Sequence, residues 1–155
     1  MGVTSALSMS ASVLQTKAPD LTAAEDSLAF RRAVQLIDGT TAGKADRVFH
    51  DRRTLATSVS EDLDLAGFLQ DGFGQALTFV RVENLFAAAA AANTNNVVLG
   101  NAASNAWAAL LGAAGTVTLR PGACLGVMAG DLLKVANSTG GTGVTYDVVI
   151  VGTSA

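Results

Sequence analysis

The sequence predicts a mostly β protein, an antiparallel β-sandwich of jelly-roll kind with an extended N-terminal arm. Short apolar runs of strand length recur along the chain at fairly even spacing, and turns rich in Gly and Asn separate them. This pattern is typical of antiparallel sandwiches and barrels. No alternation of strands with helix-length segments is visible, so a parallel α/β sheet is not expected. The length of 155 residues suits one domain, which we place at residues 25–155.

The first 24 residues are expected to form a flexible arm. They are rich in Ser, Ala and Thr, contain Pro19 and show weak periodicity. Such a segment offers too little contiguous apolar surface to offset the roughly 1–2 kcal/mol per residue that backbone ordering costs. A plain flexible tail is one alternative. In an assembly we favour an arm that is disordered in the isolated subunit and becomes ordered on a neighbouring one.

Alternating or apolar runs predict the strands in the first half of the domain. These strands are residues 28–37 (one strand or a pair), 48–49, 54–59, 62–65 and 77–86. In the last of them, Leu77, Phe79 and Arg81 are expected on one face and the residues between them on the other. Loops or turns are predicted at residues 38–43 and 71–74, where glycines cluster with Asp.

The alanine run at residues 87–92 is ambiguous, because alanine favours helix. The run is short and Asn-Thr-Asn-Asn follows at once, so we interpret it as the end of a strand. Residues 101–111 are expected to be a loop or a helical turn. Later strands are predicted at residues 97–99, 116–119, 124–128, 132–136 and 144–151. The expected core contains Phe79, Val82, Val97, Leu119, Val135, Val148 and Ile150.

Charge is scarce in the second half of the chain, and this argues against an enzyme. No Asp, Glu, Lys, Arg or His occurs from Asn84 to Leu119, whereas catalysis needs groups that move protons, attack carbon or hold metals. Charged residues make up 15% of the chain, against about 25% in an average soluble domain. A neutral surface costs little to desolvate, so it favours contact with copies of itself or with other subunits.

Nucleic acid, membranes, metals and cofactors are not expected as partners. The net charge of −3 provides no basic face for nucleic acid. Asn and Ser interrupt every window of the roughly 20 residues that a membrane span requires. Residues 39–45 differ from a phosphate-binding loop, because three residues instead of four separate the glycines and Ala45 has no hydroxyl. One His and one Cys cannot build a zinc site, and the acidic residues at 61–71 do not match a calcium loop, because Ala66 stands at its fifth position.

The candidate functional residues are therefore interface candidates. We expect them to be His50, Arg52, Arg53, Ala90, Asn95 and Trp107. The two arginines would form salt bridges between subunits, and the charge-free segment 87–111 would lie at subunit contacts, since exposed neutral surface aggregates. Trp107 would be a core or interface anchor. Cys124 lies between Ala123 and Leu125, so it is expected to be buried.

Five segments form a recognisable pattern, namely residues 46–55, 61–67, 93–98, 133–137 and 144–152. Across residues 46–155 this pattern resembles a group of small proteins encoded by tailed bacteriophages. The resemblance implies a virion component, assembled in the host cytoplasm. The leading hypothesis is a capsid decoration or cement protein, binding as a trimer to the major capsid protein. The alternatives are a tail or fibre component that contacts the host, and a carbohydrate- or receptor-binding module that uses Trp107.

Overall fold

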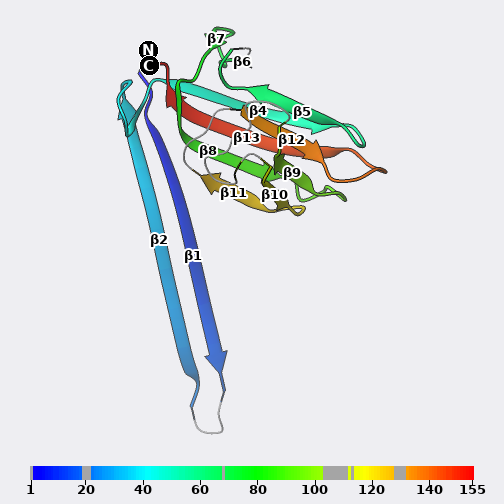
Figure 1. The fold of residues 1–155 in the computed structure, drawn as a ribbon. Coiled ribbons are helices and arrows are strands. Elements are labelled where there is room, and N and C mark those ends of the chain that lie inside the picture. The colour runs from blue at the N-terminus through cyan, green and yellow to red at the C-terminus, as the bar shows by residue number, and fades with distance from the viewer. Residues whose placement is uncertain (1, 19–21, 68, 103–111, 113, 128–131) are drawn as a thin grey trace.

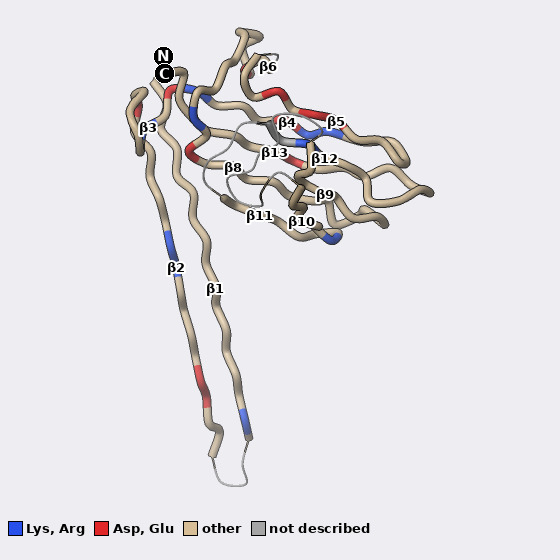
Figure 2. Tube along the Cα trace, in the orientation of Figure 1, with Lys and Arg blue, Asp and Glu red and all other residues tan. Residues whose placement is uncertain are grey.

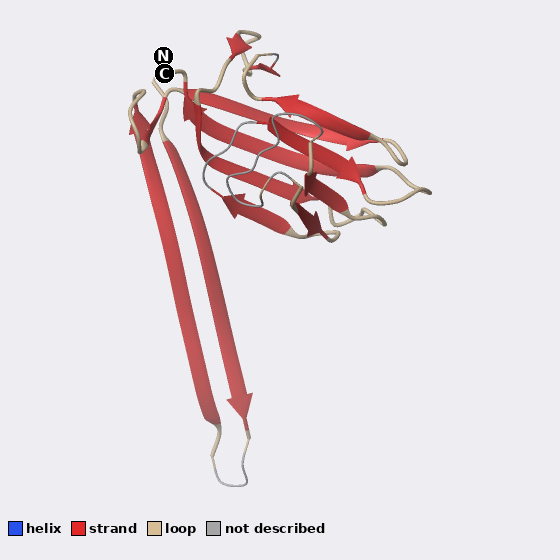
Figure 3. Ribbon diagram, in the orientation of Figure 1, coloured by secondary structure: helices blue, strands red, loops and turns tan. Residues whose placement is uncertain are grey.

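The fold is built of strands, as the sequence predicts. The computed structural model describes residues 2–18, 22–67, 69–102, 112, 114–127 and 132–155 (Figure 1). These residues contain no helix (Figure 3), and neighbouring strands are antiparallel apart from one two-residue parallel pair. The prediction of a mostly β, antiparallel protein is therefore confirmed.

A long hairpin projects from the rest of the molecule (Figure 1). It consists of β1 (Ser5–Lys17) and β2 (Ala24–Asp38). The two strands pair without interruption, from Ser5 opposite Leu36 to Lys17 opposite Ala24. The hairpin therefore includes residues on both sides of position 24, where the sequence analysis divides the arm from the domain. The order of the arm in an isolated subunit stays a prediction.

The other long strands form two four-stranded antiparallel sheets. The first sheet has the order β11-β8-β13-β4, with bounds Cys124–Val127, Arg81–Ala89, Val144–Thr153 and Arg47–Leu55. The second sheet has the order β10-β9-β12-β5, with bounds Thr116–Leu119, Val97–Gly100, Leu132–Asn137 and Ser60–Asp64. Strands that follow one another in the chain often lie in different sheets, so most pairings are long-range.

Three two-residue strands complete the fold: β3 (Lys44–Ala45), β6 (Leu69–Gln70) and β7 (Ala76–Leu77). β3 runs parallel to the end of β2. β6 and β7 flank the turn predicted at residues 71–74, and the Asp71 carboxylate holds this turn by accepting hydrogen bonds from the amides of Phe73 and Gln75, each at 2.8 Å.

One hydrophobic core takes side chains from both sheets. Buried and less buried side chains alternate along the strands, because successive side chains of a strand point to opposite faces. In β13, Val144, Tyr146, Val148 and Ile150 are buried and the residues between them are half-buried. Every residue predicted for the core is buried, namely Phe79, Val82, Val97, Leu119, Val135, Val148 and Ile150.

Three predicted strands differ from the observed ones. Residues 48–49 and 54–55 belong to one strand, β4, which ends at Leu55, so residues 56–59 lie outside it. Residues 77–86 are divided between β7 and β8, and between them the amides of Phe79 and Val80 donate to the carbonyls of Leu65 and Thr153. The alternation is lost in this irregular link. Phe79 is buried and Arg81 is exposed, so the prediction that they share a face is wrong.

The pairing of β13 with β8 contains a bulge after Val151. At the bulge, a Cβ on Gly152 would overlap the carbonyl oxygen of Arg81. Only glycine allows this close approach of two backbones. The bulge lies beside the root of the hairpin, where β13 ends.

Candidate interaction surface

The hairpin has one apolar face. Residues directly opposite in an antiparallel pair share a face, so the register assigns alternate residue pairs to the same side. The large apolar members of this side, which we call the apolar face, are Leu7, Met9, Val13, Leu28, Phe30, Val34 and Leu36. Beyond the first pairs they are exposed: the exposed fraction is 55% for Phe30 and 58% for Leu28.

The opposite face of the hairpin is mainly polar. Its residues are Ala6, Ser8, Ser10, Ser12, Leu14, Thr16, Glu25, Ser27, Ala29, Arg31, Ala33 and Gln35. Leu14 is the one large apolar side chain among these paired residues, and Ser8, Ser10 and Ser12 occupy alternate positions of β1. The hairpin is thus an amphipathic ribbon. One face is polar, and the other is apolar but exposed to water along most of its length.

The root of the hairpin is packed on the domain. Leu36 is buried with Val3, Ala45 and Val151 in a second, smaller hydrophobic cluster. Leu7 lies over Gly126 of β11, with its Cδ2 atom 3.6 Å from the position that a Cβ would take there. The apolar face therefore begins as a packed surface and continues outward as an exposed one.

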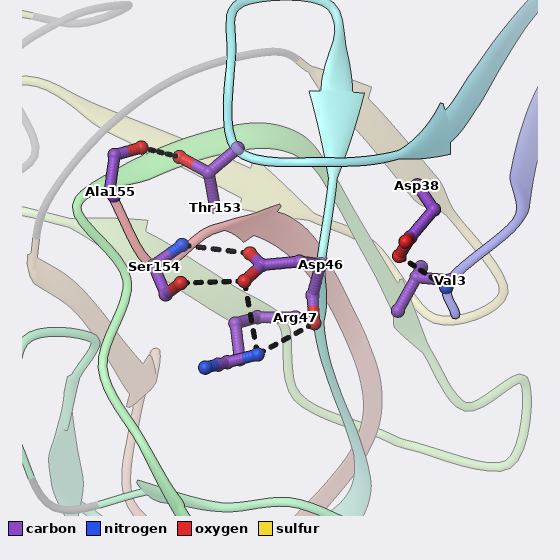
Figure 4. Close-up of polar contacts among 7 residues, drawn as sticks. All are labelled: Val3, Asp38, Asp46, Arg47, Thr153, Ser154 and Ala155. Atoms are coloured by element: carbon purple, nitrogen blue, oxygen red, sulfur yellow. Dashed lines mark hydrogen bonds and ion pairs between the residues drawn. The ribbon is translucent and has the colours of Figure 1, made fainter. Parts of the chain in front are cut away.

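Hydrogen bonds hold both ends of the chain at this root (Figure 4). The amide of Val3 donates to Asp38 Oδ1 at 2.9 Å. Asp46 accepts hydrogen bonds from the amide and the hydroxyl of Ser154, at 2.8 and 2.5 Å, and pairs with the Arg47 guanidinium at 3.0 Å. These contacts fix where the hairpin leaves the domain.

A groove of about 230 Å³ lies where the root crosses the outer face of the first sheet, between Leu7, Phe86 and Val149. The Asn84 side-chain amide and the Ser5 hydroxyl line this groove and are buried without a hydrogen-bond partner among the described residues. A buried unpaired polar group costs about 1–3 kcal/mol, so a hydrogen bond to either group would stabilise the protein.

Arg52 and Arg53 both have acidic partners within the chain. Arg52 donates from Nε and from the terminal NH2 nitrogen to the two carboxylate oxygens of Asp147, at 2.6 and 2.9 Å. This hydrogen bond lowers the pKa of Asp147 and raises that of Arg52. Arg53 contacts Glu61 at 3.0 Å and Asp51 at 3.3 Å. Salt bridges of these arginines between subunits stay a prediction.

The remaining interface candidates lie on other elements. His50 is exposed on β4, and Ala90 is half-buried just after β8. Asn95 donates to Asn137 Oδ1 at 3.0 Å and to the Thr142 carbonyl at 2.9 Å, so it ties two loops together. Trp107 lies outside the described residues, as does most of segment 101–111. The structure does not unite the described candidates in one site.

Two features of this surface differ from what the sequence predicts. Cys124 is exposed, so the prediction that it is buried is wrong: β11 is an edge strand, and its apolar flanks Ala123 and Leu125 are themselves only half-buried. The apolar face of the hairpin also went unrecognised. Its signal is present in the sequence as the alternation of Leu7, Met9, Ala11 and Val13 with serines.

Other kinds of site have no counterpart in the part of the chain that the structure describes. No group of three or more His, Cys, Asp or Glu side chains there could hold a metal ion. None of the described segments is a helix long and apolar enough to cross a membrane. No protein-family model, curated protein or solved structure matches the chain.

Proposed function

We propose that the chain is a virion structural protein of a tailed bacteriophage, of the capsid decoration or cement type. It binds outside the shell as a trimer, contacts the major capsid protein and stabilises the shell against the pressure of the packaged DNA. It carries no catalytic activity and no cofactor. The observation that carries the proposal is the long amphipathic hairpin. It projects from a β domain of low charge, and its apolar face is exposed.

The energetics of the hairpin support an assembly component. A two-stranded ribbon is marginally stable in water when nothing covers it. Burying apolar surface gains about 25 cal/mol per Å², so a neighbouring subunit that covers Met9, Val13, Leu28 and Phe30 would stabilise both the ribbon and the contact. The low charge of the domain and the resemblance to small phage proteins favour the same conclusion.

We infer further that the two sheets form a jelly-roll sandwich. If β4, β5, β8, β9, β10, β11, β12 and β13 are numbered from one to eight, the sheets have the orders 1-8-3-6 and 2-7-4-5. An eight-stranded jelly roll is a pair of such sheets, and viral capsid domains are among its users. This support is analogy at the level of the fold. Amide proton contacts in NMR spectra between β4 and β13, and between β5 and β12, would test it; a β4 paired with β5 would contradict it.

Immunogold labelling of intact virions tests the function. An antibody against this chain is applied to particles of the phage that encodes it, and the labelled part is identified by electron microscopy. Label distributed over the heads supports a decoration protein. Label on the tail or fibres supports the alternative of a host-contacting component, and unlabelled particles together with absence of the chain from purified virions contradict a virion role.

A further inference from the structure

On the apolar face of the hairpin, β2 carries two opposite charges at symmetric positions, and Lys17 at the end of β1 is a third charge on this face. Arg32 stands opposite Met9, and Asp26 stands opposite Gln15. The two pairs between them are apolar: Phe30 with Ala11 and Leu28 with Val13. Arg32 and Asp26 belong to the same strand, β2, as the separate basic and acidic bands of Figure 2 show. Two apolar pairs thus separate one cation from one anion on a face that is otherwise largely apolar.

From this pattern we propose that the hairpins of two copies of this chain pack antiparallel, apolar face against apolar face. The two-fold axis lies in the interface, perpendicular to the strands, at the level of Ala29. Such an axis reverses the strand direction but keeps β2 opposite β2. It therefore places Arg32 against Asp26 of the second copy, and Phe30 against Leu28 of the second copy. A two-fold contact repeats each of these pairs twice.

The charge pattern distinguishes this arrangement from a parallel one. In a parallel bundle of hairpins, in register, each Arg32 would meet another Arg32 in a surface that excludes water. Like charges placed directly opposite are destabilising. The antiparallel pair removes this repulsion and replaces it by two ion pairs at the ends of the apolar centre. Lys17 ends β1 at the margin of the contact, where its ammonium stays in water.

The size of the contact fits a weak, reversible association. β1 has 13 residues, so at roughly 3.3 Å per residue and about 5 Å per strand the two opposed faces bury on the order of 800 Å² in projection. Stable interfaces bury about 1,200–2,000 Å² in total. The pairing is compatible with a trimer formed through contacts between the domains. Each hairpin would then pair with the hairpin of a subunit in another trimer.

A charge-exchange cycle tests the proposal on the purified full-length protein. Sedimentation velocity over a range of concentrations measures the increase in mass as hairpins pair. Arg32→Asp places Asp against Asp26, and Asp26→Arg places Arg against Arg32, so each change alone weakens the pairing about tenfold. The double variant R32D/D26R restores opposite charges, and its affinity returns to within about threefold of the wild type.

Matched controls lie on the same strand with the opposite orientation. Arg31→Asp and Glu25→Arg make the same kinds of charge change on the polar face, each one residue from the tested position. They leave the pairing of hairpins unchanged. The proposal is overturned if the wild-type protein shows no concentration-dependent association, if R32D/D26R pairs no better than the single variants, or if R31D weakens pairing as much as R32D. None of these results bears on the virion labelling, so the two proposals can fail separately.

Discussion

Tyr146 on the first sheet donates its hydroxyl hydrogen to Oε1 of Glu61 on the second sheet, with 2.6 Å between the oxygens. The other oxygen of this carboxylate accepts a hydrogen bond from Arg53 at 3.0 Å. Tyr146 is buried in the core between the sheets. Burial raises the pKa of Tyr146 far above its ordinary value, and the hydrogen bond to Glu61 raises it further.

Tyr146 should resist ionisation for as long as the protein is folded. A raised folded-state pKa means that the stabilisation is present below the unfolded pKa of about 10 and is lost as pH rises above it. The chain has one tyrosine, so tyrosinate absorbance reports this side chain alone. We expect tyrosinate to appear in the native protein only together with unfolding, and in urea-unfolded protein near pH 10. A tyrosinate signal near that pH with the near-ultraviolet circular dichroism retained would contradict this.

The Arg52–Asp147 pair should be visible in an NMR titration. The hydrogen bond from Arg52 lowers the pKa of Asp147, so its stabilisation is present above the unfolded pKa of about 3.9 and is lost as pH falls. Arg52→Ala should raise the pKa of Asp147 toward its ordinary value. The melting temperature at neutral pH should change little, because the pair is exposed to solvent. Arg31→Ala, on the hairpin, should leave the pKa of Asp147 where it is.

Leu99→Ala should destabilise the domain strongly. The exposed fraction of Leu99 is 1%, and it lies in the core shared by both sheets. Truncation leaves a cavity and should cost about 2–5 kcal/mol in the free energy of unfolding. Val80→Ala is the matched truncation at a side chain with 59% exposure and should cost less than about 0.5 kcal/mol. Urea unfolding curves compare the two, and equal losses would show that Leu99 is not packed as described.

Gly152→Ala should destabilise the bulge between β13 and β8. The added methyl group would overlap the Arg81 carbonyl oxygen, so one of the two backbones must move, at a cost of about 1–3 kcal/mol. Gly126→Ala in β11 is the control, since its Cβ would meet only side-chain atoms at ordinary distances of 3.6 to 3.9 Å. Thermal melts of both variants measure the difference. A Gly152→Ala protein as stable as Gly126→Ala would rule out the close approach.

Ala90→Glu should weaken self-association more than it lowers the melting temperature. Ala90 is half-buried just after β8, in the neutral segment that we expect at subunit contacts. A carboxylate buried at such a contact would need a partner or a shifted pKa. Ala56→Glu, at an exposed loop position, is the control and should leave both properties unchanged. Sedimentation measures the association, and an A90E protein that assembles like A56E would remove this segment from the interface.

Local sequence patterns predict much of the fold. Period-two alternation was enough to predict the strand at Thr116–Leu119 and the burial of Val148 and Ile150, because the pleat places alternate residues on opposite faces. It failed where the backbone is irregular, as between Leu77 and Arg81. There, hydrogen bonds to Leu65 and Thr153, residues far along the chain, decide the orientation.

In the hairpin, too, local sequence patterns predict one part of the structure and contacts between distant residues decide the rest. Serines alternate with Leu7, Met9 and Val13 in the sequence. The low apolar content of the first 24 residues is nevertheless typical of a flexible tail, and the pairing with β2 is what identifies the segment as a strand. The sequence by itself determined the β class, the core residues and the scarcity of charge, since these depend on composition and on neighbours along the chain. Only the tertiary structure decided which strands pair, that Cys124 lies on an edge strand, and that Met9 and Val13 of β1 lie on the same face of the hairpin as Arg32 and Asp26 of β2. Register brings together residues distant in sequence, and local preferences do not specify it.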